Sequence, residues 1–193
     1  VNDAGAVGNL LRNDYGFEVV LLTNATRDTV IQALDSMRRR LTENDNLLVY
    51  YAGHGQLDPQ ADRGYWLPVD ATEDSRARWL SNADVTDTLK AISAKHVMVV
   101  ADSCYSGTLT RSAKRGLKLE PRTPDYITKM LGKKTRTALT SGGLEPVVDR
   151  GGEGHSVFAK PFLDALGDNK GVMDGTQMFP RVRQQVRLNA DQT

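Results

Sequence analysis

Two apolar stretches of the sequence each end in a side chain that is capable of catalysis. LVYYAGHGQ (48–56) leads to His54, which stands between two glycines, and VMVVADSCYSG (97–107) leads to Cys104, the only cysteine of the chain. A cysteine thiol acts as a nucleophile when a nearby imidazole takes its proton and later delivers that proton to the leaving group. The pair therefore predicts nucleophilic catalysis by Cys104, with His54 as the proton carrier.

The positions of His54 and Cys104 predict that they meet at one end of a sheet. Each follows a run typical of a buried strand, and open parallel sheets bind their ligands at the C-terminal ends of the strands. If the two strands are neighbours, both side chains reach one cleft. Gly55 has no side chain to obstruct a substrate carbonyl. Its backbone N–H and that of Cys104 are therefore candidates to bind the oxyanion of a tetrahedral intermediate.

Each residue also has a plain structural interpretation. A lone cysteine is often a small buried hydrophobe, and a histidine in a glycine-rich turn is often structural. The matching positions on matching strands favour the catalytic interpretation. Two alternatives stay open: a catalytically inactive interaction module with the same fold, and another kind of cysteine hydrolase or transferase.

The apolar pattern predicts an α/β fold in which strands alternate with helices. The first helix ends at Gly16, and Thr26 caps the second. Strands are expected at 17–22, 46–51, 95–101 and 137–140, a short extended piece at 65–69, helices at 82–94 and 156–166, and loops after Tyr51, at 108–136 and at 141–154. Strands that are apolar on both faces are typical of a mostly parallel sheet with helices on both faces, a three-layer sandwich.

Length and composition bound the class of protein. The 193 residues fit a single domain, 1–193. Because the first residues have a helical pattern with no capping residue before them, we expect the sequence to be a piece of a longer chain, and we expect this piece to lack the first strand. The 25 Lys+Arg against 24 Asp+Glu favour neither nucleic acid nor a membrane surface as a partner, and no apolar run reaches the ~18 residues of a membrane span. One cysteine forms no internal disulfide, which favours a reducing compartment, the cytoplasm. The sequence predicts no particular oligomeric state.

The two motifs also carry a family resemblance. YYAGHGQ followed by VVADSCYSG resembles the caspase–metacaspase–paracaspase superfamily of cysteine peptidases, in particular its bacterial members, and the likeness extends from VNDAGAVGNLL to GHSVFAKPFLDAL. The resemblance implies a caspase-like fold and peptidase activity on proteins or peptides. Two positions depart from the family: Asp102 stands where animal caspases have glutamine, and Tyr105 where metacaspases usually have histidine.

Asp102 predicts which peptide bonds are cleaved. Side chains alternate along a strand, so residues 102 and 104 project to the same side. A carboxylate there would repel an aspartate of the substrate and attract an arginine or lysine, although Asp102 could instead serve as a cap or a loop hydrogen-bond acceptor. The resemblance to paracaspases and metacaspases implies the same basic specificity.

The resemblance also implies two helpers of Asp102 in the substrate pocket. VNDAGAVGNLL is similar to the paracaspase first helix, which places a pocket aspartate at Asp3, and ALTSGGLEP is similar to the segment that supplies a pocket glutamate, at Glu145. The plain alternatives are that Asp3 favours a helix N-terminus and that Glu145 is a solvated loop residue.

A protease that prefers basic residues could also cleave its own chain. The expected loop 108–136 is rich in basic residues: Arg111, Lys114, Arg115, Lys118, Arg122, Lys133, Lys134 and Arg136. Self-processing there would reorganise the loops around the site. The alternative is that this basic stretch is simply a solvated surface.

The sequence requires no cofactor and predicts no metal site. His96 and His155 do not stand at zinc-ligand spacing from Cys104. Many metacaspases are activated by calcium, and acidic residues gather in one region: Asp58, Asp62, Asp70, Glu73 and Asp74. Because their spacing matches no calcium loop, calcium activation is left without support from the sequence.

Overall fold

The main sheet of the protein is parallel, and two of its strands lead towards the predicted catalytic residues. The computed structural model describes residues 1–103, 128, 131–141, 154–171 and 175–190. Three parallel strands lie in the order β1-β5-β6: β1 (Asn46–Ala52), β5 (His96–Asp102) and β6 (Thr135–Thr140). A smaller antiparallel sheet consists of β2 (His54–Asp58), β3 (Arg63–Leu67) and β4 (Leu80–Ser81).

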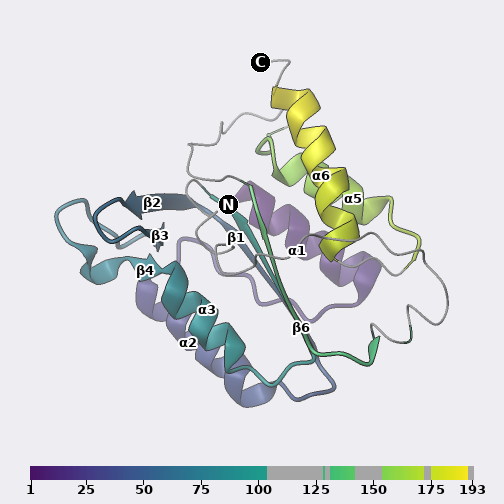
Figure 1. Ribbon diagram of the computed structural model, residues 1–193, viewed down its shortest axis with the longest axis horizontal. Helices are drawn as coiled ribbons and strands as arrows, with labels where there is room; N and C mark the ends of the chain where they lie inside the picture. The colour runs from purple at the N-terminus through teal and green to yellow at the C-terminus, as the bar shows by residue number, and fades with distance from the viewer. Residues whose placement is uncertain (104–127, 129–130, 142–153, 172–174, 191–193) are drawn as a thin grey trace.

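Helices cover both faces of the parallel sheet (Figure 1). One face carries α1 (Asn2–Tyr15), α5 (Ala159–Gly167) and α6 (Gly175–Ala190), and the other carries α2 (Arg27–Arg40) and α3 (Asn82–Lys90). A 3-10 turn, η1 (Arg76–Arg78), leads into β4. The expected three-layer α/β sandwich is therefore confirmed.

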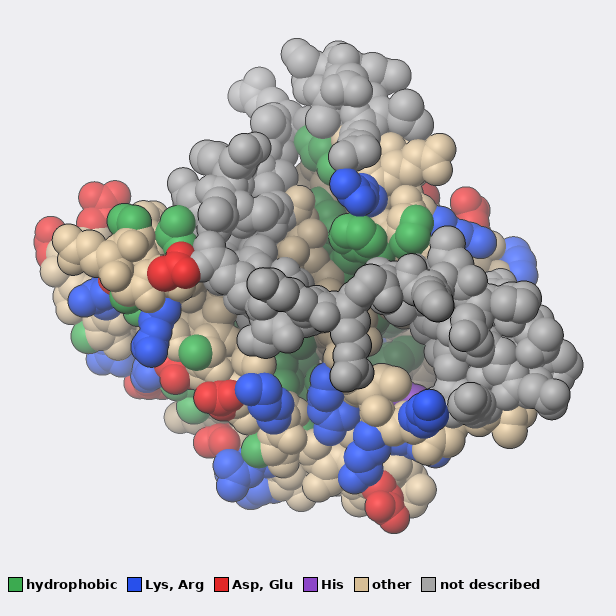
Figure 2. All heavy atoms as spheres, viewed as in Figure 1, with side chains coloured by type: hydrophobic (Ala, Val, Ile, Leu, Met, Phe, Trp, Pro, Cys, Tyr) green, Lys and Arg blue, Asp and Glu red, His purple; other side chains and the backbone are tan. Residues whose placement is uncertain are grey.

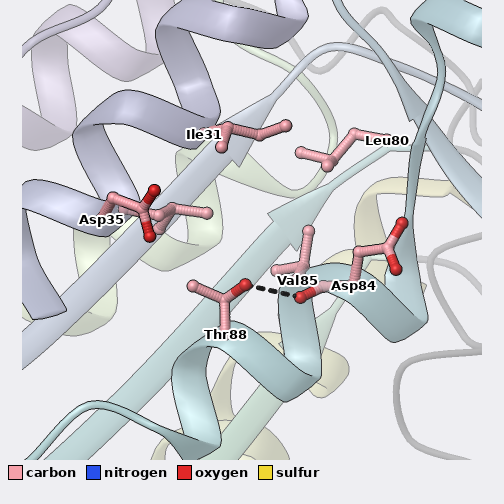
Figure 3. A pocket seen from close by; sticks show the side chains of 7 residues that line it. Ile31, Asp35, Leu80, Asp84, Val85 and Thr88 are labelled. Carbon is pink, nitrogen blue, oxygen red and sulfur yellow. Dashed lines mark hydrogen bonds between the residues drawn. The ribbon is translucent and has the colours of Figure 1, made fainter.

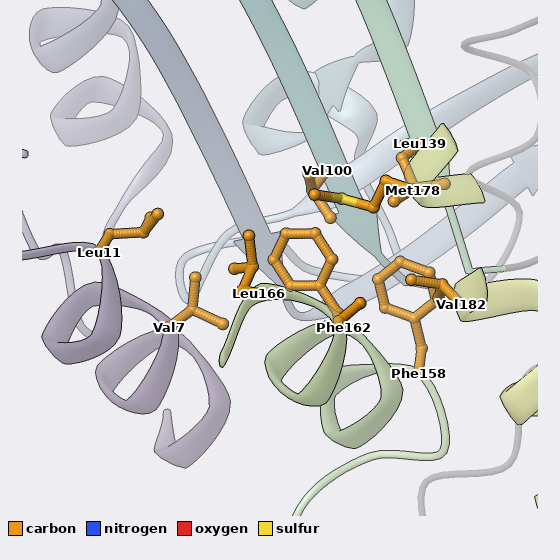
Figure 4. Close-up of a cluster of buried hydrophobic side chains, with 10 residues drawn as sticks. Val7, Leu11, Val100, Leu139, Phe158, Phe162, Leu166, Met178 and Val182 are labelled. Atoms are coloured by element: carbon orange, nitrogen blue, oxygen red, sulfur yellow. The ribbon is translucent and has the colours of Figure 1, made fainter. Parts of the chain in front are cut away.

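The strands are apolar on both faces because each face packs against a helical layer. On the first face, Val100 and Leu139 lie against Phe162 of α5 in one buried cluster, which Figure 4 shows. On the second, Val97 and Val99 lie in a cluster with side chains of α2 and α3. Since alternate residues of β5 enter different cores, the strand has no polar face. This sandwiching explains its continuous apolar run.

The two predicted helix boundaries that depend on local chemistry are confirmed. Gly16 ends α1 in the left-handed conformation, with φ of 70°, and its N–H donates to the Leu11 carbonyl. Thr26 caps α2 by accepting a hydrogen bond from the Thr29 N–H.

Several predicted elements are wrong at their ends or in their type. The segment 17–22 pairs with no strand among the described residues, and its apolar side chains Val20, Leu21 and Leu22 remain 50%, 47% and 38% exposed. The helix predicted at 82–94 ends at Lys90, although Ile92 and Ala94 beyond it are buried. These two residues are buried without being helical, and their apolar side chains therefore extended the predicted helix too far.

The C-terminal half of the chain also differs from the prediction. The helix expected at 156–166 begins at Ala159, which places Pro161 in the first turn, where a missing N–H costs no hydrogen bond. Helix α6 was not predicted, although Met178 and Val182, four residues apart, are both buried. No described helix is both long and apolar enough to cross a membrane.

Candidate active site

The strands that precede His54 and Cys104, β1 and β5, are neighbours, as expected. β1 and β5 pair in parallel, with Ala52 opposite Asp102, and the Gly53 N–H donates to the Asp102 carbonyl at 3.3 Å. His54 and Cys104 are each two positions beyond this last pair. Cys104 itself lies outside the described residues. Ser103, which directly precedes it, is buried.

His54 begins a strand and does not lie in the polar loop predicted after Tyr51. It is the first residue of β2 and pairs with Leu67 of β3, while its side chain is exposed. The Tyr51 hydroxyl donates to the His54 carbonyl at 2.7 Å, and the Tyr51 ring stacks on Trp66 with centroids 4.2 Å apart. Burial raises the pKa of the Tyr51 hydroxyl, which keeps it a donor. The stack of the partly buried Tyr51 on the buried Trp66 therefore holds the backbone from which the imidazole projects.

Gly53 is required for space and not for a left-handed turn. A Cβ at this position would lie 2.7 Å from the Tyr51 hydroxyl oxygen, and Gly53 is not among the described residues with positive φ. Any side chain here would displace the hydroxyl that binds the His54 carbonyl. Gly55 lies in β2 opposite Trp66, and its assignment to the oxyanion site stays a prediction.

Asp102 is a buried carboxylate at the tip of β5. Its side of the strand faces the α1–α5 layer and it is 8% exposed. The Ser156 hydroxyl donates to its Oδ2 at 2.5 Å, and the Tyr50 hydroxyl donates to the same oxygen at 3.4 Å. Burial raises the pKa of Asp102, hydrogen bonds from Ser156 and Ser141 oppose this, and the negative charge of Asp3 adds to it. The net direction is upward, so ionising Asp102 costs more free energy than ionising an aspartate in water.

The structure brings Asp3 to the same place. Its Oδ2 accepts from the Ser156 N–H at 3.3 Å, and its Oδ1 lies 2.6 Å from Nδ1 of His155. Asp3 and Asp102 therefore bind the backbone and the side chain of one serine. Helix α1 is tied to the same segment by a second bond, from Asn2 Nδ2 to the Gly154 carbonyl at 2.8 Å. Glu145, the third predicted pocket residue, lies outside the described residues.

Sequence reasoning missed several residues that hold this site together. Tyr50 and Tyr51 are consecutive on β1 and point to opposite faces, so that one binds Asp102 and the other binds His54. Two phenol side chains at the end of an otherwise aliphatic strand were the available signal. Ser141, directly after β6, accepts from the Ser103 N–H at 3.1 Å and donates to the Ser103 carbonyl at 3.3 Å. This pair extends the β5–β6 contact to the residue before Cys104.

The acidic residues considered for calcium are partly engaged elsewhere. Asp58 pairs with Arg76, and Asp70 accepts from the Arg27 N–H at 2.8 Å. In the part of the chain that the structure describes, no group of three or more His, Cys, Asp or Glu side chains is arranged to hold a metal ion.

One cavity among the described residues lies in the other helical layer. A cavity of about 90 Å³ lies between α2 and α3 (Figure 3) and is lined by Ile31, Leu34, Asp35, Leu80, Asp84, Val85 and Thr88. It contains none of the predicted catalytic residues.

On the face shown in Figure 2, basic and acidic side chains are interspersed across the described residues, in keeping with the formal net charge of +1.

Comparison with known proteins supports one family. The family model described as "Caspase domain" matches residues 1–193. Among curated proteins, Metacaspase-1 of Pyricularia oryzae is 29% identical over 132 residues, which are 56% of this chain and 32% of that protein. Metacaspase-1 of Meyerozyma guilliermondii is 27% identical over 129 residues, 56% of this chain and 30% of that protein. The chain thus matches about a third of the length of these relatives.

A solved structure supports the fold. The crystal structure of a protein from Geobacter sulfurreducens matches with a TM-score of 0.64 at 18% sequence identity, covering 95% of this chain and 78% of that chain.

Proposed function

The chain belongs to the caspase-domain family, and from this membership we propose that it is a cysteine endopeptidase that cleaves peptide bonds after arginine or lysine. Its partners are protein or peptide substrates. The proposed specificity rests on one observation: Asp3 and the buried Asp102 both accept hydrogen bonds from Ser156. We place its action in a reducing compartment such as the cytoplasm, because the proposed nucleophile is the only cysteine and must remain a thiol.

The proposed reaction is acyl transfer in two steps. The Cys104 sulfur attacks the scissile carbonyl carbon while His54 takes the thiol proton, and backbone N–H groups of Gly55 and Cys104 bind the resulting oxyanion. The C–N bond then breaks, His54 protonates the leaving amine, and a thioester remains on Cys104. Water activated by His54 hydrolyses the thioester and restores the thiol. The adjacency of β1 and β5 and the exposure of His54 support this assignment.

The proposed preference for arginine and lysine follows from the free-energy cost of ionising the buried Asp102. Asp102 is ionised at neutral pH only against a burial penalty that raises its pKa. An arginine or lysine side chain would supply the opposite charge, and a guanidinium could bind a carboxylate through two parallel hydrogen bonds. An aspartate in the same place would add a further negative charge. The pocket should therefore favour basic over acidic residues.

The proposal is tested with three fluorogenic peptides that differ only in arginine, lysine or aspartate before the cleaved bond. We expect kcat/KM for the arginine and lysine peptides to exceed that for the aspartate peptide by at least about 10²-fold, the effect of a close charge pair replaced by a repulsion. Preferred cleavage after aspartate would contradict the pocket assignment. Cleavage of none of the peptides would favour the inactive interaction module.

We also propose self-processing in the 108–136 segment. Most of the segment lies outside the described residues. The bond after Arg136 is an unsuitable cleavage site, because Arg136 belongs to β6 and its guanidinium donates to the Ile92 and Lys95 carbonyls at 2.7 and 3.2 Å. On incubation, wild type should yield fragments whose new C-terminus is Arg or Lys at a position before 136, whereas Cys104→Ala should stay intact. Mass spectrometry identifies the ends. Equal fragmentation of the two proteins would refute self-processing.

A further inference from the structure

We propose that Tyr51 is a positioning residue for His54: its hydroxyl binds the His54 carbonyl and so holds the backbone in the position from which the imidazole serves the Cys104 thiol. This inference rests on the proposed function, in which His54 carries the proton. A catalytic base paired with a nucleophile is commonly oriented by a third group, and the inference assigns that part to Tyr51, acting through the backbone.

The Tyr51 hydroxyl closes a short ring across the turn that presents His54. β1 ends at Ala52 and β2 begins at His54, so one residue, Gly53, carries the chain from one sheet to the other. The Tyr51 hydroxyl donates to the His54 carbonyl at 2.7 Å. The Gly53 N–H donates to the Asp102 carbonyl of β5 at 3.3 Å. The chain is therefore tied at His54 itself and at the residue before it.

The phenol ring that carries this hydroxyl is fixed by stacking. It lies on Trp66 with ring centroids 4.2 Å apart and planes inclined by 3°, and Trp66 is 2% exposed. In the β2–β3 ladder, Trp66 lies opposite Gly55 and Leu67 lies opposite His54. The Tyr51 hydroxyl is also 3.4 Å from the Leu67 carbonyl. It cannot leave the His54–Leu67 pair without disrupting the aromatic stack.

The imidazole of His54 depends on its backbone for its orientation. The side chain is exposed, and within the described part of the chain its ring makes no hydrogen bond. The ladder with Leu67 and the bond from Tyr51 hold the backbone. A general base acts only within hydrogen-bond reach of the proton it takes, at about 3 Å, and a displacement of about 1 Å can cost up to about 10²-fold in rate. Loss of the Tyr51 bond should therefore slow proton transfer.

Tyr51 lies on the face of the sheet opposite the proposed pocket. Its side chain packs with the cluster that includes α2 and α3, whereas Tyr50 packs on the other face and donates to Asp102. Removal of the Tyr51 hydroxyl therefore leaves the contacts of Asp102 and Asp3 in place. The expected signature is a lower kcat with an unchanged KM, because the substrate is bound as before and only the base is misplaced.

The test variant is Tyr51→Phe, which keeps the ring on Trp66 and removes the hydroxyl. For an arginine peptide, we expect kcat to fall about tenfold or more and KM to change less than about twofold. The matched control is Tyr15→Phe, because the Tyr15 hydroxyl donates to the Leu166 carbonyl, also at 2.7 Å, between α1 and α5. Both variants are assayed well below their unfolding midpoints. A general loss of stability would lower kcat in both, whereas loss of positioning lowers it in Tyr51→Phe alone.

A second arm asks whether Tyr51 acts through His54. In the His54→Ala background, Tyr51→Phe should lower kcat no further, because no imidazole remains to be positioned. Single-turnover measurements on wild type, the two single variants and the double variant give the four rates. A fall by the same factor in both backgrounds would show that Tyr51 only supports the fold, and would overturn its positioning role.

The outcomes separate this inference from the proposed function. If wild type cleaves the arginine peptide and His54→Ala is strongly impaired, but Tyr51→Phe keeps the wild-type kcat, the role of Tyr51 alone is overturned. If wild type cleaves no peptide, or His54→Ala cleaves as well as wild type, the proposed function fails and this inference fails with it.

Discussion

The His54→Ala and Cys104→Ala variants are each expected to lower kcat for an arginine peptide by at least about 10⁴-fold, and the double variant no further than the more damaging single variant. The reason is that an imidazole without its nucleophile, or a thiol without its proton carrier, completes no step of the reaction. Parallel pairing of β1 with β5 places the two motifs on adjoining strands, as the proposed joint action requires. Single-turnover measurements on all three variants and wild type provide the comparison.

The matched control for this series is His96→Ala. His96 is also a histidine, but it begins β5 at the end remote from Asp102, so its replacement should leave kcat close to the wild-type value. If the losses caused by His54→Ala and Cys104→Ala multiplied in the double variant, the two residues would act independently. A loss of less than about tenfold in His54→Ala would show that another group carries the proton.

The Asp102→Asn variant is expected to lose activity and gain stability. Its kcat/KM for an arginine peptide should fall by about 10²-fold or more, because the amide removes the charge that binds the guanidinium. The same change should raise the midpoint of thermal unfolding at neutral pH. The amide oxygen can still accept from Ser156 and Tyr50, while the burial cost of a carboxylate disappears.

The pH dependence of stability follows from the direction of the Asp102 pKa shift. Burial raises this pKa in the folded protein above its ordinary value of 3.8, so the folded state holds the proton more tightly than the unfolded chain. The resulting stabilisation is fully present below the unfolded pKa and is lost as the pH rises through the folded pKa. Unfolding curves of wild type and Asp102→Asn should therefore converge in acid and separate towards neutral pH.

The exposed Asp87, which pairs with Lys90 on α3, provides the control. Asp87→Asn removes the same charge from the surface and should change neither the arginine kcat/KM nor the pH profile appreciably. Unchanged cleavage after arginine in Asp102→Asn would remove Asp102 from the pocket. Lower stability of that variant at neutral pH would show that the ionised carboxylate is a net stabilising group.

Features that depend on neighbouring residues could be predicted from the sequence. The end of α1 at Gly16 and the cap of α2 at Thr26 rest on interactions that span only a few positions. The apolar runs of β1 and β5 identified the two central strands, because a strand between two helical layers is apolar throughout. Both runs stop at the point where His54 and Cys104 follow.

Features that depend on a distant partner were predicted poorly. The segment 17–22 has the composition of a strand, yet it pairs with none of the described strands. β2 lacks an apolar pattern, yet it is a strand because β3 returns beside it. In both cases a backbone ladder, and not the local sequence, decides the structure.

The sequence by itself indicated which side chains could act as nucleophile and proton carrier, and that each of them follows a buried strand. Only the tertiary structure decided that the two strands are neighbours and which residues surround the site: Tyr50 and Ser156 on Asp102, Tyr51 on the His54 carbonyl, and His155 on Asp3. The physical reason is that a strand or helix repeats its contacts at a regular interval along the chain, which leaves a readable period. A hydrogen bond between segments far apart in the chain occurs once and leaves no such trace.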